Sequence, residues 1–383
     1  MPLRILHLAR TINRYDFIDT IVRYLPSDRF ALEVATFEAQ ASLEEPHYEE
    51  IGIPHHVVRV PHWRAYLAYF SAAYKLWRLI KRRNIHILHT HHYWEGFIGS
   101  LVKRLAPRLK FILHRHYTED VVRVPGIKGR FLRKLEAFAY ASVDVLLVPT
   151  PTMAEFIQLH YPKTSLPLVV IPYGFDLGQL KYQPLSAAER LAVRAQYGVR
   201  EETIVIGNFA THRWQKGQHL LLEAVAELVR RGYPIQLWLV GGGPTTPALQ
   251  AQAQRLGIME FCTFWGWQRG PIVRMLMGSC DIIAHPTYSE AFPQVMVEAL
   301  ALERALVITA VSGAREWLKP GVHALVVPPG DEVALLEALL ALVQQPERRR
   351  ELGTAGRAQV LAHLSYAAIN PAYEALYQRL CSL

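Results

Sequence analysis

The alternation of short aliphatic runs with amphipathic stretches is the feature that most constrains how this chain can fold. Runs such as "LRILHL" (3–8) and "VDVLLVP" (143–149) are almost continuously apolar instead of alternating with polar residues. Such runs are typical of parallel strands that are covered on both faces. Helical stretches separate most of them, so the pattern predicts repeated β-α units and doubly wound parallel sheets.

The pattern is interrupted once, by a polar stretch that follows "IPYGFD" (171–176) and ends near residue 202. The strands that we predict before the interruption are residues 3–8, 31–37, 55–60, 85–90, 110–115, 143–149 and 168–172. Those predicted after it are residues 203–209, 235–241, 262–266, 280–286, 305–310 and 324–330. Helices predicted at 331–343, 346–362 and 366–381 end the chain.

We therefore predict two Rossmann-like domains, because 383 residues with 51% hydrophobic composition can form two cores. The first covers residues 1–175 and the second 203–363, with a hinge at 176–202. The last helix, about 364–383, could pack back on the first domain. Open α/β sheets bind ligands at the carboxyl ends of their strands, so a ligand in the cleft between the two domains is the first functional hypothesis.

Composition excludes several other classes of protein. With 20% charged residues and no internal repeat, the chain is not of the disordered or solenoid type. No apolar run reaches the roughly 18 residues of a transmembrane helix, and the start of the chain is typical of a strand rather than a secretory signal. Three cysteines without metal-type spacing indicate reduced thiols in a cytoplasmic protein.

Positive charge is concentrated in the first domain. Residues 59–134 contain 17 lysines and arginines against 3 acidic residues, in a chain of net charge +9. The segment "HWRAYLAYFSAAYKLWRLIKRR" (62–83) mixes aromatic side chains with cations, as helices at anionic membrane surfaces do. The alternative is a packing helix with solvated cations. Nucleic acid is a poorer partner, because no RNA- or DNA-binding module is visible.

A candidate anion site follows the first strand of the second domain. In "RWQKG", Arg213, Lys216 and Gly217 open a predicted helix, whose N-terminus offers N–H groups and a positive dipole end. Phosphate is the natural guest of such a site. The alternative is a basic loop at a solvated helix start.

The next strand of that domain ends in three glycines, "GGG" at 241–243. They allow a tight turn at the carboxyl end of the strand, and Pro244 suits the first turn of a helix. The segment is not a GxGxxG fingerprint, which makes a dehydrogenase a weak interpretation. A glycine turn without a ligand role stays open as well.

Two glutamates in "SEAFPQVMVEAL" (289–300) have different predicted environments. Glu290 lies in a strand-to-helix loop, whereas Glu298 lies more than a turn inside the helix that Pro293 begins. Glu298 shares a helix face with Val295, Ala299 and Leu302. A carboxylate in an apolar stripe needs donors, and a ribose diol would supply two hydroxyls. A capping or salt-bridged glutamate is the alternative.

Histidines gather at the ends of two predicted strands of the first domain, in "HTHHYW" (89–94) and "HRH" (114–116). Imidazole is a common metal ligand, so a metal site is one interpretation. No carboxylate or cysteine completes the pattern. We therefore favour a ligand pocket lined by strand-end histidines, among them His89, His91 and His92.

Taken together, these segments resemble the retaining glycosyltransferases of family four, also called group one. The matching segments run in order: "VIPYGFD", "RWQKGQHLLLEA", "LVGGGPTTPALQ", "CTFWGW", "HPTYSEAFPQVMVEALA", "ITAVSGAREWL" and "GVHALVVPPGD". They cover roughly residues 168–345, and the first domain resembles the family in outline. The resemblance implies the GT-B fold, in which two Rossmann-like doubly wound parallel-sheet domains face an interdomain cleft.

The resemblance also implies roles for single residues. Glu290 corresponds to the glutamate near the transferred sugar, Glu298 to the glutamate on the nucleotide ribose, and Lys216 to the lysine on the donor diphosphate. The other residues implied on the donor side are Arg213, Gly217, Gly243, Trp267, Phe292, Gln294 and Val295. His116, at the end of "FILHRH", resembles the family's histidine facing the sugar, and we place it with Glu290 as catalytic. With a transferase implied, we expect His89, His91 and His92 on the acceptor side.

The family implies a nucleotide-diphosphate sugar as co-substrate, no metal and no cofactor, because cations and helix ends neutralise the leaving diphosphate. It implies retention of anomeric configuration by front-face attack. Three positions depart from its pattern. The loop "ARTINRYDF" lacks paired glycines, Thr211 stands where an arginine is common, with Arg213 as our substitute, and Pro293 replaces a residue with a backbone N–H.

The function that we predict is transfer of a sugar from a nucleotide-diphosphate sugar to a hydroxyl of a glycan or lipid-linked acceptor. The protein would be cytoplasmic, with a possible peripheral place on the inner face of the cytoplasmic membrane. A sugar-nucleotide epimerase on the same fold is one alternative. A non-catalytic protein that binds nucleotide sugars is the other, and the altered "RTINRYD" loop makes it conceivable.

Overall fold

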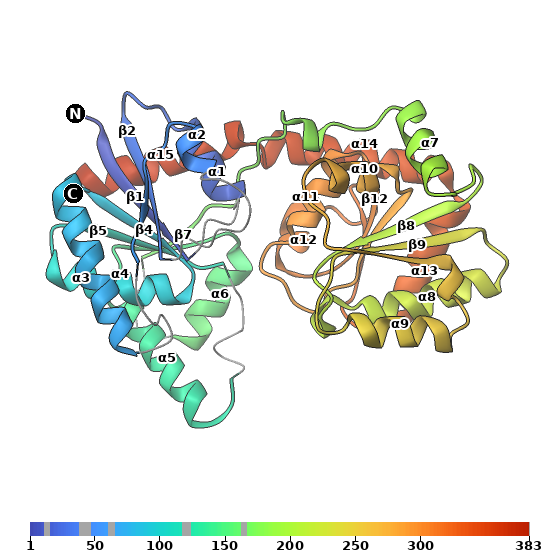
Figure 1. Ribbon diagram of the computed structural model, residues 1–383, viewed down its shortest axis with the longest axis horizontal. Coiled ribbons are helices and arrows are strands. Elements are labelled where there is room, and N and C mark those ends of the chain that lie inside the picture. The colour runs from blue at the N-terminus through green and yellow to red at the C-terminus, as the bar shows by residue number, and fades with distance from the viewer. Residues whose placement is uncertain (11–15, 38–46, 60–65, 117–123, 162–166, 383) are drawn as a thin grey trace. The chain divides into compact units, whose positions relative to one another are not determined.

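The computed structural model describes residues 1–10, 16–37, 47–59, 66–116, 124–161 and 167–382. These residues fold as two compact α/β units (Figure 1). Unit 1 comprises Met1–Asp176 together with Tyr366–Leu383, and unit 2 comprises Leu177–Ser365. None of the described helices is both long enough and apolar enough to cross a membrane.

Unit 1 is built on a parallel sheet of seven strands in the order β3-β2-β1-β4-β5-β6-β7. Its strands are β1 (Leu3–Ala9), β2 (Phe30–Thr36), β3 (His55–Val57), β4 (Ile87–His91), β5 (Lys110–His114), β6 (Val145–Val148) and β7 (Leu168–Val170). Each coincides with a run that the sequence predicted as a strand. The register pairs His7 of β1 with His89 of β4, and His91 of β4 with His114 of β5.

Helices cover both faces of this sheet (Figure 1). They are α1 (Asp16–Tyr24), α2 (His47–Glu50), α3 (Tyr66–Arg83), α4 (Tyr93–Leu105), α5 (Gly126–Tyr140), α6 (Pro151–His160) and α15 (Tyr366–Ser382). The last of them, α15, ends the chain but lies on unit 1, where Tyr366 stacks on Tyr24 of α1 at 3.9 Å between ring centroids. Tyr373 and Tyr377 of α15 are both fully buried there.

Unit 2 repeats the architecture with six parallel strands in the order β10-β9-β8-β11-β12-β13. These strands are β8 (Ile204–Phe209), β9 (Ile235–Val240), β10 (Cys262–Gly266), β11 (Ile282–His285), β12 (Ala305–Thr309) and β13 (Leu325–Val327). The helices are η1 (Leu180–Tyr182), α7 (Ala187–Gln196), η2 (Trp214–Lys216), α8 (Gln218–Arg230), α9 (Thr246–Arg255), η3 (Met259–Phe261), α10 (Pro271–Ser279), α11 (Gln294–Ala301), α12 (Ser312–Trp317), α13 (Glu332–Gln344) and α14 (Pro346–His363). The two parallel sheets confirm the predicted fold class.

The stretch 176–202, which the sequence analysis treated as a hinge, is folded and largely part of unit 2. Ser186 caps α7 in a capping box with Glu189. On the same helix, the side chains of Arg190 and Arg194 form ion pairs with Asp281 at 3.0 and 2.5 Å. The polar residues of the stretch 176–202 therefore include those of a surface helix, α7, whose arginines pair with the residue immediately before β11.

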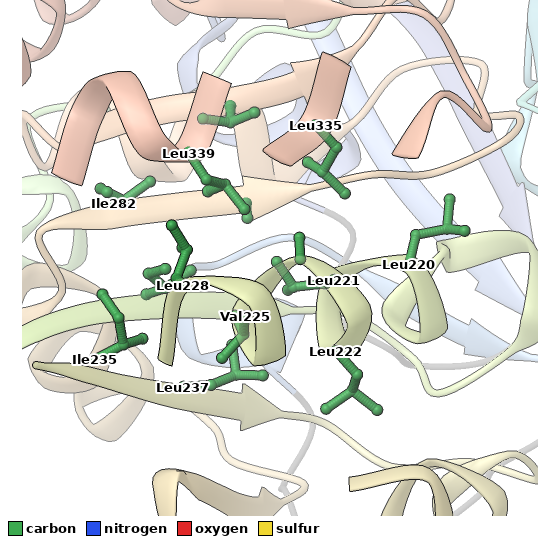
Figure 2. Packing of buried hydrophobic residues seen from close by; sticks show 14 of the residues in the cluster. Leu220, Leu221, Leu222, Val225, Leu228, Ile235, Leu237, Ile282, Leu335 and Leu339 are labelled. Atoms are coloured by element: carbon green, nitrogen blue, oxygen red, sulfur yellow. The ribbon is translucent and has the colours of Figure 1, made fainter. Parts of the chain in front are cut away.

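The core of unit 2 lies between its sheet and the helices α8 and α13 (Figure 2). Leu221 and Leu228 of α8 and Leu335 and Leu339 of α13 are each no more than 1% exposed. Figure 2 shows these leucines between the two helices, with Ile282 of β11 beside them. Burial of such side chains, at about 25 cal/mol per Å² of apolar surface, is the main stabilising term of the unit.

We expect the substitution Leu339→Ala to lower the free energy of unfolding of unit 2 by about 2–5 kcal/mol, because it removes buried methyl groups and leaves a cavity. Val333→Ala on the same helix is the control, since Val333 is 66% exposed. Denaturant unfolding followed by tryptophan fluorescence measures both. Equal unfolding midpoints for the two variants would contradict this description of the core.

Candidate active site

Three loops at the carboxyl ends of β8, β9 and β11 are tied to one another by hydrogen bonds. The backbone N–H of Tyr288 and the hydroxyl of Thr287 both donate to the carbonyl of Gln215, at 2.8 and 3.0 Å. The backbone N–H of His212 donates to the carbonyl of Gly242 at 2.9 Å. These bonds hold the predicted anion loop, the glycine turn and the loop before α11 at one edge of the unit 2 sheet.

Two glycines let these loops approach closely. Gly217 adopts a left-handed conformation with φ of 69°, and a Cβ there would lie 2.0 Å from the carbonyl oxygen of Pro286. A Cβ on Gly243 would lie 2.4 Å from the carbonyl oxygen of His212. A side chain at either position would collide with backbone, so both glycines are needed for the arrangement of the loops.

Glu290 lies between two cationic or potentially cationic groups. Its Oε1 is 2.9 Å from Nζ of Lys216, and its Oε2 is 2.8 Å from Nε2 of His285. The side chains of Lys216 and Glu290 are 21% and 22% exposed, whereas that of His285 is 2% exposed. The ion pair joins the loop after β8 to the loop after β11, and His285 fixes the carboxylate from the strand itself.

This environment keeps Glu290 ionised. Burial by itself raises the pKa of a carboxyl group, but the charge and hydrogen bonds of His285 and Lys216 outweigh it here and lower the pKa of Glu290 to about 2. The ordinary value is 4.5. A permanently charged carboxylate can accept hydrogen bonds from hydroxyl groups but cannot donate a proton.

Glu298 occupies a different environment, as the sequence predicted. It is half-buried on α11, which begins at Gln294, and its helix neighbours Val295 and Ala299 are buried. Pro293 stands immediately before the helix, with φ of −71°. The two glutamates are therefore separated into a loop position and a helix position.

Of the remaining residues implied on the donor side, Arg213 and Phe292 lie on these loops, whereas Trp267 follows β10 and Gln294 and Val295 begin α11. Arg213 is exposed just before η2, and among the described residues its guanidinium forms no ion pair. Trp267, after β10, is 66% exposed, and its Nε1 would lie 2.8 Å from a Cβ on Gly242. Phe292 is buried next to Pro293. Arg213 and Trp267 thus present side chains at the loop surface, while Phe292 contributes to packing.

Unit 1 brings the predicted histidines together with residues that sequence reasoning missed. His89, His91 and His114 of β4 and β5 are fully buried, as is His7 of β1. The ring of His7 contacts those of His89 and His91, and the ring of His114 contacts that of His89 from the other side of β4. His116 follows β5, with its ring centroid 4.0 Å from that of His114. The lone histidine in "LRILHLA" carried no signal until the register placed it beside β4.

His92 lies at the edge of this group. It immediately precedes α4, has a φ of 71° and is half-buried. Its ring centroid is 4.7 Å from that of His116. Both ring nitrogens of His116 are at hydrogen-bonding distance from other side chains, namely Nδ1 of His91 at 3.0 Å and the hydroxyl of Tyr173 at 2.6 Å. A substrate hydroxyl would have to replace one of these partners.

Two sets of three histidines have the spacing of metal ligands. In His7, His89 and His91, and again in His91, His114 and His116, one nitrogen of each ring lies within 4.8 Å of the others. At least two of these nitrogens are hydrogen-bonded to each other, however. Nδ1 of His7 and Nε2 of His91 lie 3.1 Å apart in rings inclined by 15°, which is the geometry of a hydrogen bond between them.

The basic segment of unit 1 is a packed helix with a cationic outer face. Residues 60–65 lie outside the described residues, but Ala72 and Leu76 of α3 are fully buried, as a packing helix requires. Its exposed side carries Phe70 and Tyr74, which are 60% and 54% exposed. A pocket of about 1020 Å³ lies beside it, lined by His55, His56, Val57, Val58, Arg59, Lys75, Trp77, Arg78, Leu79, Lys81 and Arg82.

Two family models match the chain, one on each side of residue 180. The model described as glycosyl transferases group 1 matches residues 189–359, and the model described as Glycosyltransferase Family 4 matches residues 17–179. A D-inositol 3-phosphate glycosyltransferase of Segniliparus rotundus is 27% identical over 278 residues, which are 70% of this chain. An alpha-D-kanosaminyltransferase of Streptomyces kanamyceticus is 26% identical over half of each chain. The match spans 61% of the first relative's own length.

Solved structures with the same fold cover nearly the whole chain. The Anabaena protein Alr3699/HepE in complex with UDP and glucose superposes with a TM-score of 0.81 at 22% identity, over 100% of both chains. The sucrose-phosphate synthase of Thermosynechococcus elongatus superposes with a TM-score of 0.83 at 18% identity, over 99% of both chains. At these identities the similarity establishes the fold.

We expect Lys216→Met to raise the pKa of Glu290 from about 2 toward its ordinary value or above, because burial then opposes ionisation with one cation fewer. Carbon NMR of labelled glutamate carboxyls measures the titration, and Lys319→Met, at an exposed lysine of the same unit, is the control. Because the folded pKa is depressed, the pair stabilises the fold above pH 4.5 and loses this contribution as the pH falls toward 2. An unchanged titration in Lys216→Met would refute the pairing.

Proposed function

The chain belongs to the group 1 glycosyltransferases, and we propose that it transfers a sugar from a nucleotide-diphosphate sugar to a hydroxyl of a glycan or lipid-linked acceptor. The observation that carries the proposal is the Lys216–Glu290–His285 arrangement at the carboxyl ends of β8 and β11. The relatives support it, because two of them are named as transferases of sugars or their derivatives. UDP is a reasonable first donor nucleotide, since the Anabaena structure contains UDP and glucose.

Lys216 is proposed to bind the donor diphosphate. Its ammonium group is already held at the sheet edge, and α8 begins two residues later, with N–H groups that the helix does not use. A diphosphate carries more negative charge than a single carboxylate, so it can draw the ammonium from Glu290. Arg213, which is exposed on the same loop, supplies a second cation.

Glu290 is proposed to orient the transferred sugar. Once Lys216 turns to the diphosphate, His285 still holds one oxygen of the carboxylate, which leaves the other to accept a sugar hydroxyl. Glu298 is proposed to bind the ribose diol from α11, whose N-terminus lies near Phe292, Gln294 and Val295. His116 remains our candidate for the sugar from unit 1.

The departure of the nucleoside diphosphate is the step that these groups assist. The bond between the anomeric carbon and the diphosphate oxygen breaks, and negative charge grows on the leaving oxygen. Lys216, Arg213 and the start of α8 offset that charge, so the proposed reaction requires no metal. We also propose retention of anomeric configuration, by attack of the acceptor hydroxyl on the face that the diphosphate leaves. The acceptor oxygen then bonds to the anomeric carbon, and its proton passes to the departing diphosphate oxygen.

An anionic membrane surface is proposed as a partner, with the protein at the inner face of the cytoplasmic membrane. The support is the cationic outer face of α3, where Lys75, Arg78 and Arg82 line the pocket and Phe70 and Tyr74 are exposed. Aromatic side chains at the interface and cations near lipid phosphates are the features of peripheral attachment.

We expect Glu298→Ala to weaken binding of the nucleoside diphosphate by about tenfold to a hundredfold, since hydrogen bonds to a charged group contribute about 1.5–3 kcal/mol. A thermal-shift screen with uridine, guanosine and adenosine diphosphates identifies the nucleotide, and calorimetry then gives the affinity. Glu337→Ala, at an exposed glutamate of α13, is the matched control and should bind normally. Unchanged affinity in Glu298→Ala would rule out the ribose assignment.

For Glu290→Gln we expect a large fall in turnover with little change in nucleotide affinity, because the sugar and not the nucleotide loses its charged acceptor. Donor consumption and nucleotide affinity are measured on the same preparation. The assignment fails if the affinity falls as far as the turnover.

Vesicle sedimentation tests the membrane surface. Each cation near an anionic bilayer contributes about 1 kcal/mol, so replacing Lys75, Arg78 and Arg82 by serine should lower partitioning about a hundredfold. The control replaces the exposed Arg200, Arg230 and Arg350 of unit 2, which removes the same charge elsewhere. Equal partitioning to neutral and anionic vesicles would exclude this partner.

A further inference from the structure

Six buried or half-buried rings of unit 1 form one continuous hydrogen-bonded chain. The chain runs from Tyr173 to His116, His91, His7, Tyr377 and finally His89, with successive distances of 2.6, 3.0, 3.1, 3.4 and 2.8 Å. It therefore connects the ends of β1 and β4 with the C-terminal helix α15. Of these rings, His116 is the one that the proposed function places against the sugar, and His89 and His91 were predicted on the acceptor side.

Each histidine of this hydrogen-bonded chain is neutral and carries a proton on one of its two ring nitrogens. Burial lowers the pKa of His7 to about 3. Burial, assisted by neighbouring imidazoles, lowers the pKa values of His89, His91 and His116 well below 6.5. A neutral imidazole has one donor nitrogen and one acceptor nitrogen. Where both nitrogens of a ring are used, the direction of one hydrogen bond therefore fixes the direction of the next.

The hydrogen-bonded chain of rings stops at His89. Nδ1 of His89 lies 2.8 Å from the hydroxyl of Tyr377, but its Nε2 is sealed from solvent and has no hydrogen-bond partner among the described residues. A buried N–H without an acceptor is rare in proteins and costs its full desolvation energy. The proton of His89 therefore belongs on Nδ1, from which it donates to the oxygen of Tyr377.

The donor and acceptor of every other hydrogen bond in this chain of rings follow from the position of the proton on His89. The hydroxyl of Tyr377 accepts from His89, so its own O–H donates to Nε2 of His7. The proton of His7 is then on Nδ1 and donates to Nε2 of His91. The proton of His91 is likewise on Nδ1 and donates to Nε2 of His116.

We propose that Tyr377 is a positioning residue that, through His7 and His91, holds His116 with its proton on Nδ1 and with Nε2 as an acceptor. Nδ1 of His116 donates to the hydroxyl of Tyr173. The acceptor nitrogen suits a sugar hydroxyl, which could replace the N–H of His91. That last consequence rests on the proposed function, whereas the protonated nitrogen itself does not.

Nitrogen NMR of the full chain, labelled at histidine, tests the proposal because the two ring nitrogens of a neutral histidine have distinct shifts. The signal is assigned with His116→Gln. We expect His116 to carry its proton on Nδ1 alone. In Tyr377→Phe the link between His89 and His7 is absent, so we expect His116 to become a mixture of both tautomers.

Tyr373→Phe is the matched control. Tyr373 lies on the same helix and is fully buried like Tyr377, but its hydroxyl has no hydrogen-bond partner in the part of the chain that the structure describes. A general loosening of α15 would affect both variants. The proposal requires that Tyr373→Phe leaves the tautomer of His116 unchanged.

Three results would overturn the proposal. They are a proton on Nε2 of His116 in the unaltered protein, an unchanged tautomer in Tyr377→Phe, and stoichiometric Zn²⁺ binding that shifts the signals of His7, His89 and His91. If Tyr377→Phe does not fold, the first and third measurements still decide. The tautomer of His116 is measured without sugar donor or acceptor substrate. A wrong tautomer assignment can therefore be told apart from a failure of the protein to transfer sugar.

Discussion

Parallel strand pairing is the constraint on which both candidate sites depend. In each unit the strands run in one direction, so all their carboxyl ends, and the loops that follow them, meet at a single edge of the sheet. Residues far apart in sequence are thereby brought together, as Lys216 and Glu290 are in unit 2 and as His7 and His91 are in unit 1. Because helices cover both faces of each sheet, the strand residues are mostly apolar. Polar side chains therefore gather at the edge where the carboxyl ends of the strands meet.

The two edges have opposite electrostatic characters. In unit 2, the edge holds a charged carboxylate paired with a lysine and hydrogen-bonded to a histidine, and we propose that a donor diphosphate takes Lys216 from this pair. In unit 1, the edge holds imidazoles that burial keeps neutral and that are joined to one another by hydrogen bonds. Under the proposed function, the first edge would offset charge on the leaving diphosphate and the second would orient the sugar.

The sequence predicted the strands and the position of the two glutamates because these depend on local patterns. Continuous aliphatic runs identified the strands, and Pro293 separated the loop position of Glu290 from the helix position of Glu298. What could not be predicted depends on register between distant strands. His285 and His7 were unremarkable as single residues, and the polar composition of 176–202 did not predict that this stretch contains the surface helix α7. Most of "ARTINRYDF" lies outside the described residues.

Product analysis by mass spectrometry tests the central claim most directly. The protein is incubated with the nucleotide sugar that stabilises it best, once alone and once with a panel of glycan and lipid-linked acceptors. The account predicts that nucleoside diphosphate is released in proportion to the sugar that appears on an acceptor hydroxyl, and that Glu290→Gln strongly lowers both. An isomerised donor formed without acceptor, or a donor that is bound and left unchanged under every condition, would contradict it.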